Sequence, residues 1–226
     1  ASLERQVIKS EKLAKTGDKL VLSQLELFEN CIKELNTKGS LKQLEFEPNE
    51  REILNVFNLL TIKPMMLVAN VKEGCFTDNR HLDALKKYAE DLKIPVVPIC
   101  ASLEAQLVDF NESEKVEFLT ESGIAEPGLN IFIREAFKLL GLHTFFTAGP
   151  KEVRAWTIKK EATAPKAAGE IHSDFERGFI RADVVSYEDF IYCGSEVNAK
   201  ETGKLRSEGK DYIVNDGDII HFKFNV

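Results

Sequence analysis

The sequence predicts an α/β protein with three successive parts: a helical hairpin, a piece of parallel sheet with crossover helices, and a small mixed sheet wrapped on one helix. Three patterns predict this fold class. Apolar residues recur at spacings of three and four near the N-terminus, two short apolar runs alternate with helical patterns in the middle, and short β-rich pieces separated by turn residues follow residue 141. A chain of 226 residues that is 43% hydrophobic can bury cores of this kind.

Residues 1–40 predict two antiparallel helices. Gly17-Asp18 interrupts the helical pattern and predicts a tight turn, and residues 36–40 end the second helix. The second helix carries the a/d pattern of a short coiled-coil seam, formed by Val21, Leu25, Phe28, Ile32 and Leu35. Two interpretations stay open: a plain packing hairpin, or a projecting arm that meets a large partner.

Residues 41–141 alternate between strand and helix patterns. The apolar run at residues 64–69 ends at Asn70 and predicts a strand buried on both faces, and residues 94–99 predict a second strand. Ser102 is expected to cap the following helix, and helical spacing also covers residues 78–91, 112–120 and 129–140. This order predicts parallel strands with crossover helices. Two strands are too few for a complete doubly wound sheet, so this part is expected to belong to something larger.

Residues 142–226 predict a small mixed sheet of the β-grasp kind. The sequence favours strands at residues 144–148, 153–158, 179–185, 212–214 and 219–224, with helices at residues 168–177 and 195–202. Turn chemistry at residues 209–211 and 215–218 separates the last of them.

Composition excludes several classes of protein. The charged fraction is 30% and the formal net charge is −7, which excludes a uniformly basic coat for nucleic acid but not a local basic patch. No apolar run approaches the roughly 20 residues that span a bilayer. The four cysteines and four histidines are dispersed, so we expect no metal site, reduced thiols and a cytoplasmic protein without a membrane partner.

The most informative tetrad is Asn70-Val71-Lys72-Glu73, which follows the first predicted strand. The second predicted strand leads into Ala101-Ser102-Leu103. Ligands of open parallel sheets bind at the carboxyl ends of strands, so the two loops predict a socket for the edge of a purine base. Asn70 would fix the loop or meet the base, and Val71 would pack on its face. The alternative is that Asn70 caps a turn and Glu73 is merely solvated.

The sequence contains no element that handles phosphate. The phosphate-loop pattern G-x-x-x-x-G-K-[ST] is absent, and no Asp that would bind magnesium follows a buried strand before Asn70. The chain alone is therefore expected to bind nucleotide poorly and to hydrolyse none. Glutamate-rich stretches at residues 50–52 and 112–114 are typical of solvated helix faces, so no catalytic residue is predicted.

A basic cluster surrounds Trp156 in the last part. It is a candidate contact with RNA or the ribosome through phosphates, and it consists of Lys151, Arg154, Lys159, Lys160 and Lys166. The alternative is that Trp156 belongs to the core and that the lysines serve solubility.

Long strings in the last part carry a specific resemblance. They are FTAGPKEVRAWT at residues 146–157, AAGEIHSDFERGFIRA at residues 167–182, EGKDYIVNDGD at residues 208–218 and HFKFNV at residues 221–226. These strings resemble the TGS domain of YchF-type (Obg-like) ATPases in the TRAFAC P-loop GTPase superfamily. The resemblance covers essentially the whole chain and corresponds to the C-terminal part of such a protein, without its phosphate loop.

The resemblance implies three domains: a coiled-coil arm (residues 1–40), part of a P-loop G domain with its base-recognition loops (residues 41–141) and a ubiquitin-like β-grasp TGS domain (residues 142–226). It also implies a monomeric, ribosome-associated nucleotidase that regulates translation or a stress response. The full-length protein would hydrolyse ATP or GTP with Mg²⁺. A TGS-based adaptor or an RNA-binding module without a nucleotide role is the alternative.

The resemblance further assigns Asn70, Val71, Lys72 and Glu73 to base recognition. A typical GTPase has Asn-Lys-x-Asp there, and its Asp accepts hydrogen bonds from N1–H and the 2-amino group of guanine. Val71 and the longer Glu73 spoil that geometry, whereas adenine has no 2-amino group to lose. A preference for ATP is expected.

Overall fold

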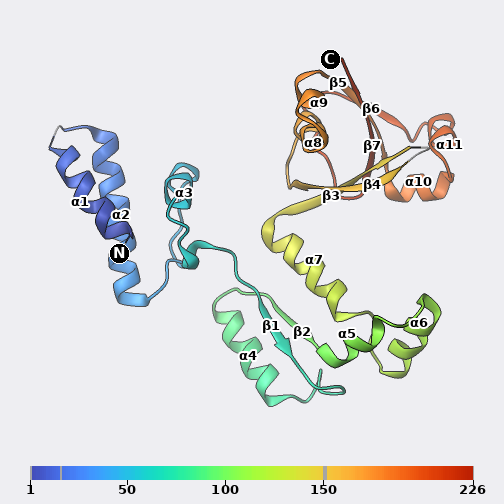
Figure 1. Ribbon diagram of the computed structural model, residues 1–226, viewed down its shortest axis with the longest axis horizontal. Helices are drawn as coiled ribbons and strands as arrows, with labels where there is room; N and C mark the ends of the chain where they lie inside the picture. Colours follow the sequence, from blue (N-terminus) through green and yellow to red (C-terminus); the bar gives the residue numbers. More distant parts are fainter. Residues whose placement is uncertain (1, 16, 150–151, 226) are drawn as a thin grey trace. The chain divides into compact units, whose positions relative to one another are not determined.

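The computed structural model describes residues 2–15, 17–149 and 152–225. The chain divides into two compact units, Ala1–Met65 and Met66–Val226, called here the first and the second unit. Figure 1 gives the order of their elements.

The first unit begins with two packed helices, α1 (Ser2–Ala14) and α2 (Lys19–Lys38). Gly17 adopts a left-handed φ of 77° in the turn, and the Asp18 side chain caps α2 by accepting from the Leu20 N–H at 2.9 Å. Leu3 at the start of α1 shares a core with Cys31 in the second half of α2, so the helices are antiparallel. The two predicted helices and their turn are confirmed, whereas the coiled coil stays a prediction.

The rest of the first unit folds against this pair. Helix α3 (Pro48–Asn55) has Pro48 in its first turn and a capping box between Glu47 and Glu50, and the short helix η1 (Leu60–Ile62) follows. Their apolar residues complete a core that contains Leu3, Leu27, Phe28, Cys31, Leu41 and Leu54.

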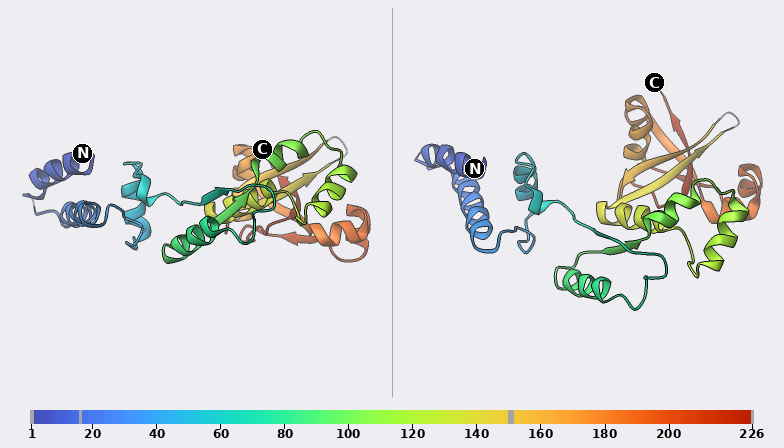
Figure 2. Two further views of the ribbon diagram at one scale, coloured as in Figure 1. Left: turned by 90° about the horizontal axis from the view of Figure 1, so that it is seen from below. Right: turned by 60° about the horizontal axis from the view of Figure 1, so that its bottom comes forward.

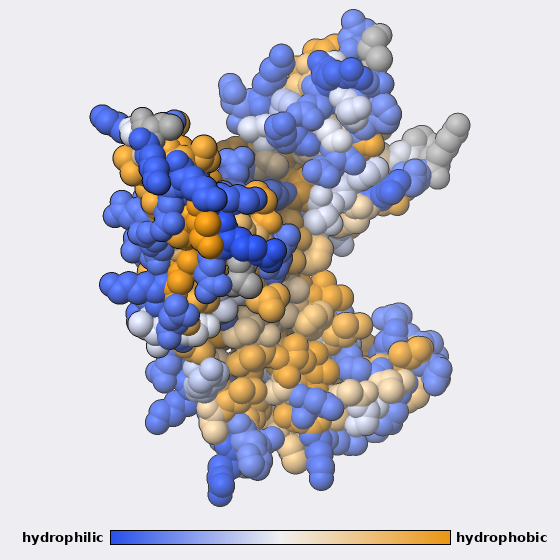
Figure 3. Space-filling view, turned by 60° about the vertical axis from the view of Figure 1, so that its left-hand side comes forward, coloured by the Kyte–Doolittle hydropathy of each residue, from blue (hydrophilic) through white to orange (hydrophobic). Residues whose placement is uncertain are grey.

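Some apolar side chains of the hairpin stay in solvent. Ile8, Leu13 and Leu20 near the α1–α2 turn are 55%, 58% and 75% exposed. Figure 3 shows apolar side chains among hydrophilic ones on the face that it turns forward. Scattered exposed apolar residues are ordinary on protein surfaces, so they do not by themselves mark an interface.

The second unit opens with two parallel strands, β1 (Leu67–Asn70) and β2 (Val96–Ile99), joined through α4 (Arg80–Asp91). Parallel pairing and the crossover helix are confirmed. The expectation of a first strand buried on both faces is wrong, because burial alternates along β1 and Val68 is 48% exposed. The strand is also shorter than residues 64–69: its pairing starts where the Leu67 N–H bonds the carbonyl of Pro95, 2.9 Å away.

Three helices follow β2: α5 (Ala101–Leu107), α6 (Glu112–Glu121) and α7 (Gly128–Leu140). The prediction that Ser102 caps α5 is wrong. Helix α5 begins two residues earlier than a cap at Ser102 would give, so Cys100 occupies the N-cap and Ser102 lies inside the first turn. At the other end of this segment, Gly141 adopts a left-handed φ of 63° and is the single residue between α7 and the next strand.

A five-stranded mixed sheet completes the second unit, in the order β4-β3-β7-β5-β6. Strands β3 and β7 are parallel, and the other neighbours are antiparallel. The strands are β3 (Leu142–Ala148), β4 (Val153–Lys159), β5 (Phe179–Ser186), β6 (Arg206–Glu208) and β7 (Asp218–Phe224). The helices are α8 (Ala164–Ile171), α9 (Ser173–Arg177), α10 (Tyr187–Cys193) and α11 (Glu196–Glu201).

Helix α8 lies against one face of this sheet (Figure 2). Its small residues Ala164, Ala167 and Ala168 are fully buried, which lets the helix approach closely the core residues Phe145 and Phe222. The mixed sheet on one main helix agrees with the sequence prediction.

Three details differ from the prediction. Residues 212–214 form no strand, only an isolated bridge between Ile213 and Thr163. The predicted helix at residues 168–177 is two helices, because His172 is extended and its ring nitrogen accepts from the Asp174 N–H at 3.1 Å, which caps α9. Strand β6 was not predicted, because it is polar and only three residues long. Helix α10 was also not predicted.

Among the described residues, no helix combines the length and the apolar character needed to cross a bilayer.

Candidate functional site

The loops after β1 and β2 lie next to each other at the carboxyl edge of the parallel sheet. Asn70 pairs with Ile99 in the register, and the Val71 N–H donates to the Ile99 carbonyl at 2.8 Å. The side-chain Oδ1 of Asn70 then accepts from the backbone N–H of Ala101 at 3.2 Å. The Asn70 side chain thus links the first loop to the second one.

The exposed members of the two loops are Asn70, Lys72, Glu73, Ala101 and Ser102. The Cys75 N–H bonds the carbonyl of Lys72 at 3.0 Å and closes a turn, in which Gly74 has a left-handed φ of 71°. Glu73 lies at the corner of this turn, where its carboxylate is open to solvent.

Val71 and Leu103 point into the protein instead. They are only 8% and 2% exposed, and they share a core with Leu82 and Cys100. The expectation that the Val71 side chain packs on the face of a base is therefore wrong, because the strand pleat turns Val71 inward after the exposed Asn70. The buried side chains of Val71 and Leu103 anchor the two loops to the core.

A cavity of about 340 Å³ lies on the core side of these loops. Its described lining includes Gly74, Cys100 and Leu103, and does not include Asn70, Glu73 or Ser102. Beside it, Oε1 of Glu104 accepts from the Gly128 N–H at 2.7 Å. A Cβ at Gly128 would lie 3.1 Å from that oxygen, so glycine permits the close approach of α5 to the start of α7.

The basic cluster is only partly brought together. The Arg154 guanidinium lies 4.2 Å above the ring of Trp156, and the indole N–H donates to the Thr147 hydroxyl at 2.9 Å. Trp156 also stacks on the buried Phe145, so its ring belongs partly to the core. Lys151 lies outside the described residues.

The remaining lysines lie elsewhere. Lys159 follows the buried Ile158 on β4 and therefore faces the side of the sheet opposite to it. Lys160 lines a second cavity, described below. On α8, the Lys166 ammonium lies 2.6 Å from the carboxylate of Glu176, whose hydrogen bond raises the pKa of Lys166. Among the described members of the basic cluster, Arg154 thus pairs with Trp156, while Lys160 and Lys166 have other surroundings.

The structure contains a cavity that the sequence did not indicate, lined in part by Arg134, Lys138, His143 and Asp216. These residues come from α7, β3 and the segment before β7, so no short motif could have revealed it. Within residues 2–15, 17–149 and 152–225, no group of three or more His, Cys, Asp or Glu side chains is arranged to hold a metal ion.

Comparison with known proteins identifies relatives of this chain. Residues 142–225 match the family model YchF-GTPase_C, described as "Protein of unknown function (DUF933)". Proteins named "Ribosome-binding ATPase YchF" are 49% identical in Pasteurella multocida and 42% identical in Bacillus subtilis. Each of these alignments covers 100% of this chain and 62% of the relative, so the chain spans about three fifths of their length.

Solved structures agree as well. The Schizosaccharomyces pombe YchF GTPase superposes with a TM-score of 0.86 and 28% identity, covering 98% of this chain and 61% of that one. A GTP-binding protein from Pyrococcus horikoshii shares the fold at a TM-score of 0.53 and 18% identity, covering 85% of this chain and 64% of that one. The chain belongs to the YchF family.

Proposed function

We propose that this chain contributes the base-reading edge of the nucleotide site in a ribosome-associated ATP- and GTP-binding hydrolase. The observation that carries the proposal is the hydrogen bond from the Ala101 N–H to Asn70 Oδ1. It ties together the ends of two parallel strands, which is where open α/β sheets bind ligands. The relatives' printed name, ribosome-binding ATPase, supports the same function.

Base selectivity in this proposal depends on Glu73. Its carboxylate is exposed at the corner of a turn that Gly74 shapes. The side chain is one methylene longer than the Asp of a typical GTPase tetrad, which displaces the carboxylate from a bidentate contact with guanine. Adenine does not need that contact, so ATP is the preferred nucleotide. Lys72 and Ser102 frame the loops, and the buried Val71 and Leu103 hold them in shape.

The domain assignment is part of the proposal. Residues 1–40 form the arm, residues 41–141 belong to a G domain, and residues 142–226 form a TGS domain that contacts the ribosome together with the arm. The mixed sheet with α8 on one face supports the TGS assignment.

Hydrolysis in the whole protein would use Mg²⁺ on the phosphates, as P-loop enzymes do. The described residues do not fit a magnesium site, since they form no cluster of three candidate ligands. We therefore assign this chain the recognition of the base and no step in phosphoryl transfer.

Calorimetry on the full-length protein tests the base-reading role. ATP and GTP are titrated into the unaltered protein, Glu73→Asp and the control Glu90→Asp, which changes an exposed glutamate on α4. We expect Glu73→Asp to shift the ATP-to-GTP affinity ratio toward GTP by about tenfold, the scale of one good polar contact. An unchanged ATP-to-GTP affinity ratio would refute the role of Glu73 in base selectivity. If the full-length protein bound neither nucleotide, the proposed hydrolase function would be refuted.

The second candidate function is an adaptor or RNA-binding module without a nucleotide role. The Arg154–Trp156 pair favours it, because a cation beside an aromatic face can engage phosphate and base together. This function predicts RNA binding that weakens steeply with salt. Ribosome co-sedimentation that is unaltered by Arg154→Glu, Lys159→Glu and Lys160→Glu would count against it.

A further inference from the structure

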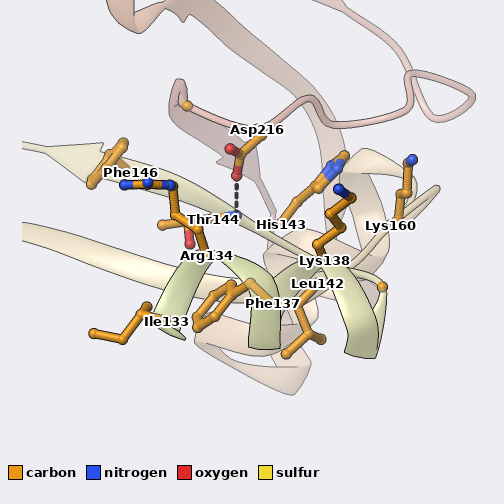
Figure 4. Close-up of a pocket in the computed structure, with 12 residues that line it drawn as sticks. Ile133, Arg134, Phe137, Lys138, Leu142, His143, Thr144, Phe146, Lys160 and Asp216 are labelled. Carbon is orange, nitrogen blue, oxygen red and sulfur yellow. Dashed lines mark hydrogen bonds between the residues drawn. The ribbon is translucent and has the colours of Figure 1, made fainter. Parts of the chain in front are cut away.

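A cavity of about 520 Å³ opens between α7, β3 and the segment before β7 (Figure 4). Its volume is within the range of about 300–1,000 Å³ that is usual for small-molecule sites. The lining combines cationic and apolar side chains, including Phe137, Lys138, His143, Phe146, Lys160 and Asp216.

The backbone holds the cationic side together. The Gly141 N–H bonds the Lys138 carbonyl at 3.2 Å, and the Gly141 carbonyl accepts from the Lys160 N–H at 2.7 Å. The backbones of Lys138 and Lys160 are therefore both hydrogen-bonded to Gly141. Lys138 pairs with Glu135 at 3.8 Å, and none of the ion pairs among the described residues includes Lys160.

Arg134 has a different role, because both its terminal nitrogens bond the carboxylate of Glu126, one of them at 2.6 Å. The positive charge of Arg134 is therefore already compensated by Glu126. The positive charge available to a ligand comes from Lys138 and Lys160.

His143 has no assigned role in binding. Its Nδ1 is buried from solvent and has no hydrogen-bond partner among the described residues. The side chain lies on the same face of β3 as the buried Phe145, opposite to Phe146, so a ligand in the cavity does not reach this nitrogen.

The cavity also has an apolar side and, opposite to it, a wall that contains Asp216. Phe137 and Phe146 supply ring surface from α7 and β3. Asp216 Oδ1 accepts from the Thr144 N–H at 2.7 Å, and the Gly217 N–H donates back to the Thr144 carbonyl at 2.8 Å. This double attachment fixes the wall and leaves the second carboxylate oxygen of Asp216 able to accept a donor from a ligand.

We propose that this cavity binds a small phosphate ester that carries a planar ring with an amino or N–H group. Its phosphate oxygens accept hydrogen bonds from Lys138 and Lys160, since a phosphate offers several acceptor oxygens and a charge opposite to the lysines. The ring packs on Phe137 and Phe146, and its donor bonds Asp216. This site is separate from the Asn70–Ala101 loops and does not depend on their proposed function.

Heteronuclear NMR on the isotope-labelled 226-residue chain tests the proposal. The probes are adenosine 5′-monophosphate, which has the required ring, amino group and phosphate, then adenosine, which lacks the phosphate, and inorganic phosphate, which lacks the ring and amino group. We expect the monophosphate to shift the amide signals of Thr144, Lys160 and Gly217, with an affinity at least about tenfold above that of adenosine or of inorganic phosphate. Equal binding of the monophosphate and inorganic phosphate would refute a built site for the ring.

Variants complete the test. Lys160→Glu and Lys138→Glu should each weaken binding by about tenfold or more, whereas Lys159→Glu, the adjacent lysine on β4, should leave it unchanged. Asn70→Ala should also leave these shifts unchanged. Three outcomes would overturn the proposal: no shifts at millimolar probe, an equal effect of Lys159→Glu, or shifts confined to the amides of residues 70–73 and 101–103. If the Lys138 and Lys160 variants lower thermal stability without altering the titration, the lysines serve the end of α7 only.

Discussion

The carboxamide of Asn70 accepts a hydrogen bond from the backbone N–H of Ala101 across 3.2 Å, although the two residues are 31 positions apart in the chain. One side chain thus links the loops that follow β1 and β2. An aspartate at this position would accept the same bond, whereas alanine would not.

Asn70→Ala should loosen the Ala101 loop. A net loss of about 0.5–1.5 kcal/mol in the free energy of unfolding is expected for one exposed hydrogen bond. Nucleotide affinity of the full-length protein should fall by about tenfold, because the loop is no longer held in place. Chemical denaturation and calorimetry measure the two effects. Asn30→Ala, an exposed asparagine on α2, serves as control, and an equal loss of affinity in that variant would contradict the role of Asn70.

Gly178→Ala should strongly destabilise the five-stranded sheet. A Cβ there would overlap with the carbonyl oxygen of Asn225, and the backbone of both residues is held by the hydrogen bond from the Asn225 N–H to the Gly178 carbonyl. A loss of about 3 kcal/mol or more is expected from such an overlap. Thermal unfolding measures it against Gly209→Ala, where a Cβ meets no atom within 4 Å. Equal melting temperatures of the two variants would show that the end of β7 moves aside freely.

Tyr212 should make stability depend on pH in the alkaline range. Burial, and then its hydrogen bond to the 2%-exposed Asp218, raise the pKa of Tyr212 in the folded protein. The folded state therefore favours the neutral phenol. The resulting stability is fully present below the unfolded pKa of about 10 and is lost as the pH rises through the higher folded pKa.

Unfolding free energies between pH 7 and pH 11 measure this effect. Tyr212→Phe should be less stable than the unaltered protein at pH 7, and the difference should shrink above pH 10. Parallel curves for the two proteins over the whole range would assign the alkaline loss to other groups.

Cys31 should resist alkylation. The side chain is fully buried, and burial followed by the charge of Glu50 raises the pKa of its thiol to about 11. At pH 8 its thiolate fraction is about a hundredfold below that of an ordinary thiol, and only the thiolate reacts. Mass spectrometry after timed iodoacetamide treatment should find the partly exposed Cys75 and Cys193 modified first. Modification of Cys31 at the same rate would indicate opening of the first unit.

Sequence patterns predicted elements where local chemistry decides them. Gly17 and Gly39 marked the ends of helices, and the apolar runs before Asn70 and Cys100 marked the parallel strands. Strand β6 was not predicted, because Arg206–Glu208 is polar and becomes a strand only by pairing with β5.

The candidate site, too, could be predicted from the sequence only in part. The proximity of Asn70 and Ala101 follows from the parallel sheet, because the ends of neighbouring strands meet at one edge. The direction of Val71 depends on the pleat and on the core beneath it, which spacing alone does not specify. The second cavity could not be predicted, since Lys138, Lys160 and Asp216 meet only after the chain has folded.

Helix α7 has an anchor at each end. Glu104 holds its first residue, Gly128, beside the parallel sheet, and Gly141 joins its last turn to β3 and to Lys160. A helix of 13 residues is a stiff rod of about 20 Å. Since hydrogen bonds attach it at both ends, α7 is the element that joins the parallel strands to the five-stranded sheet.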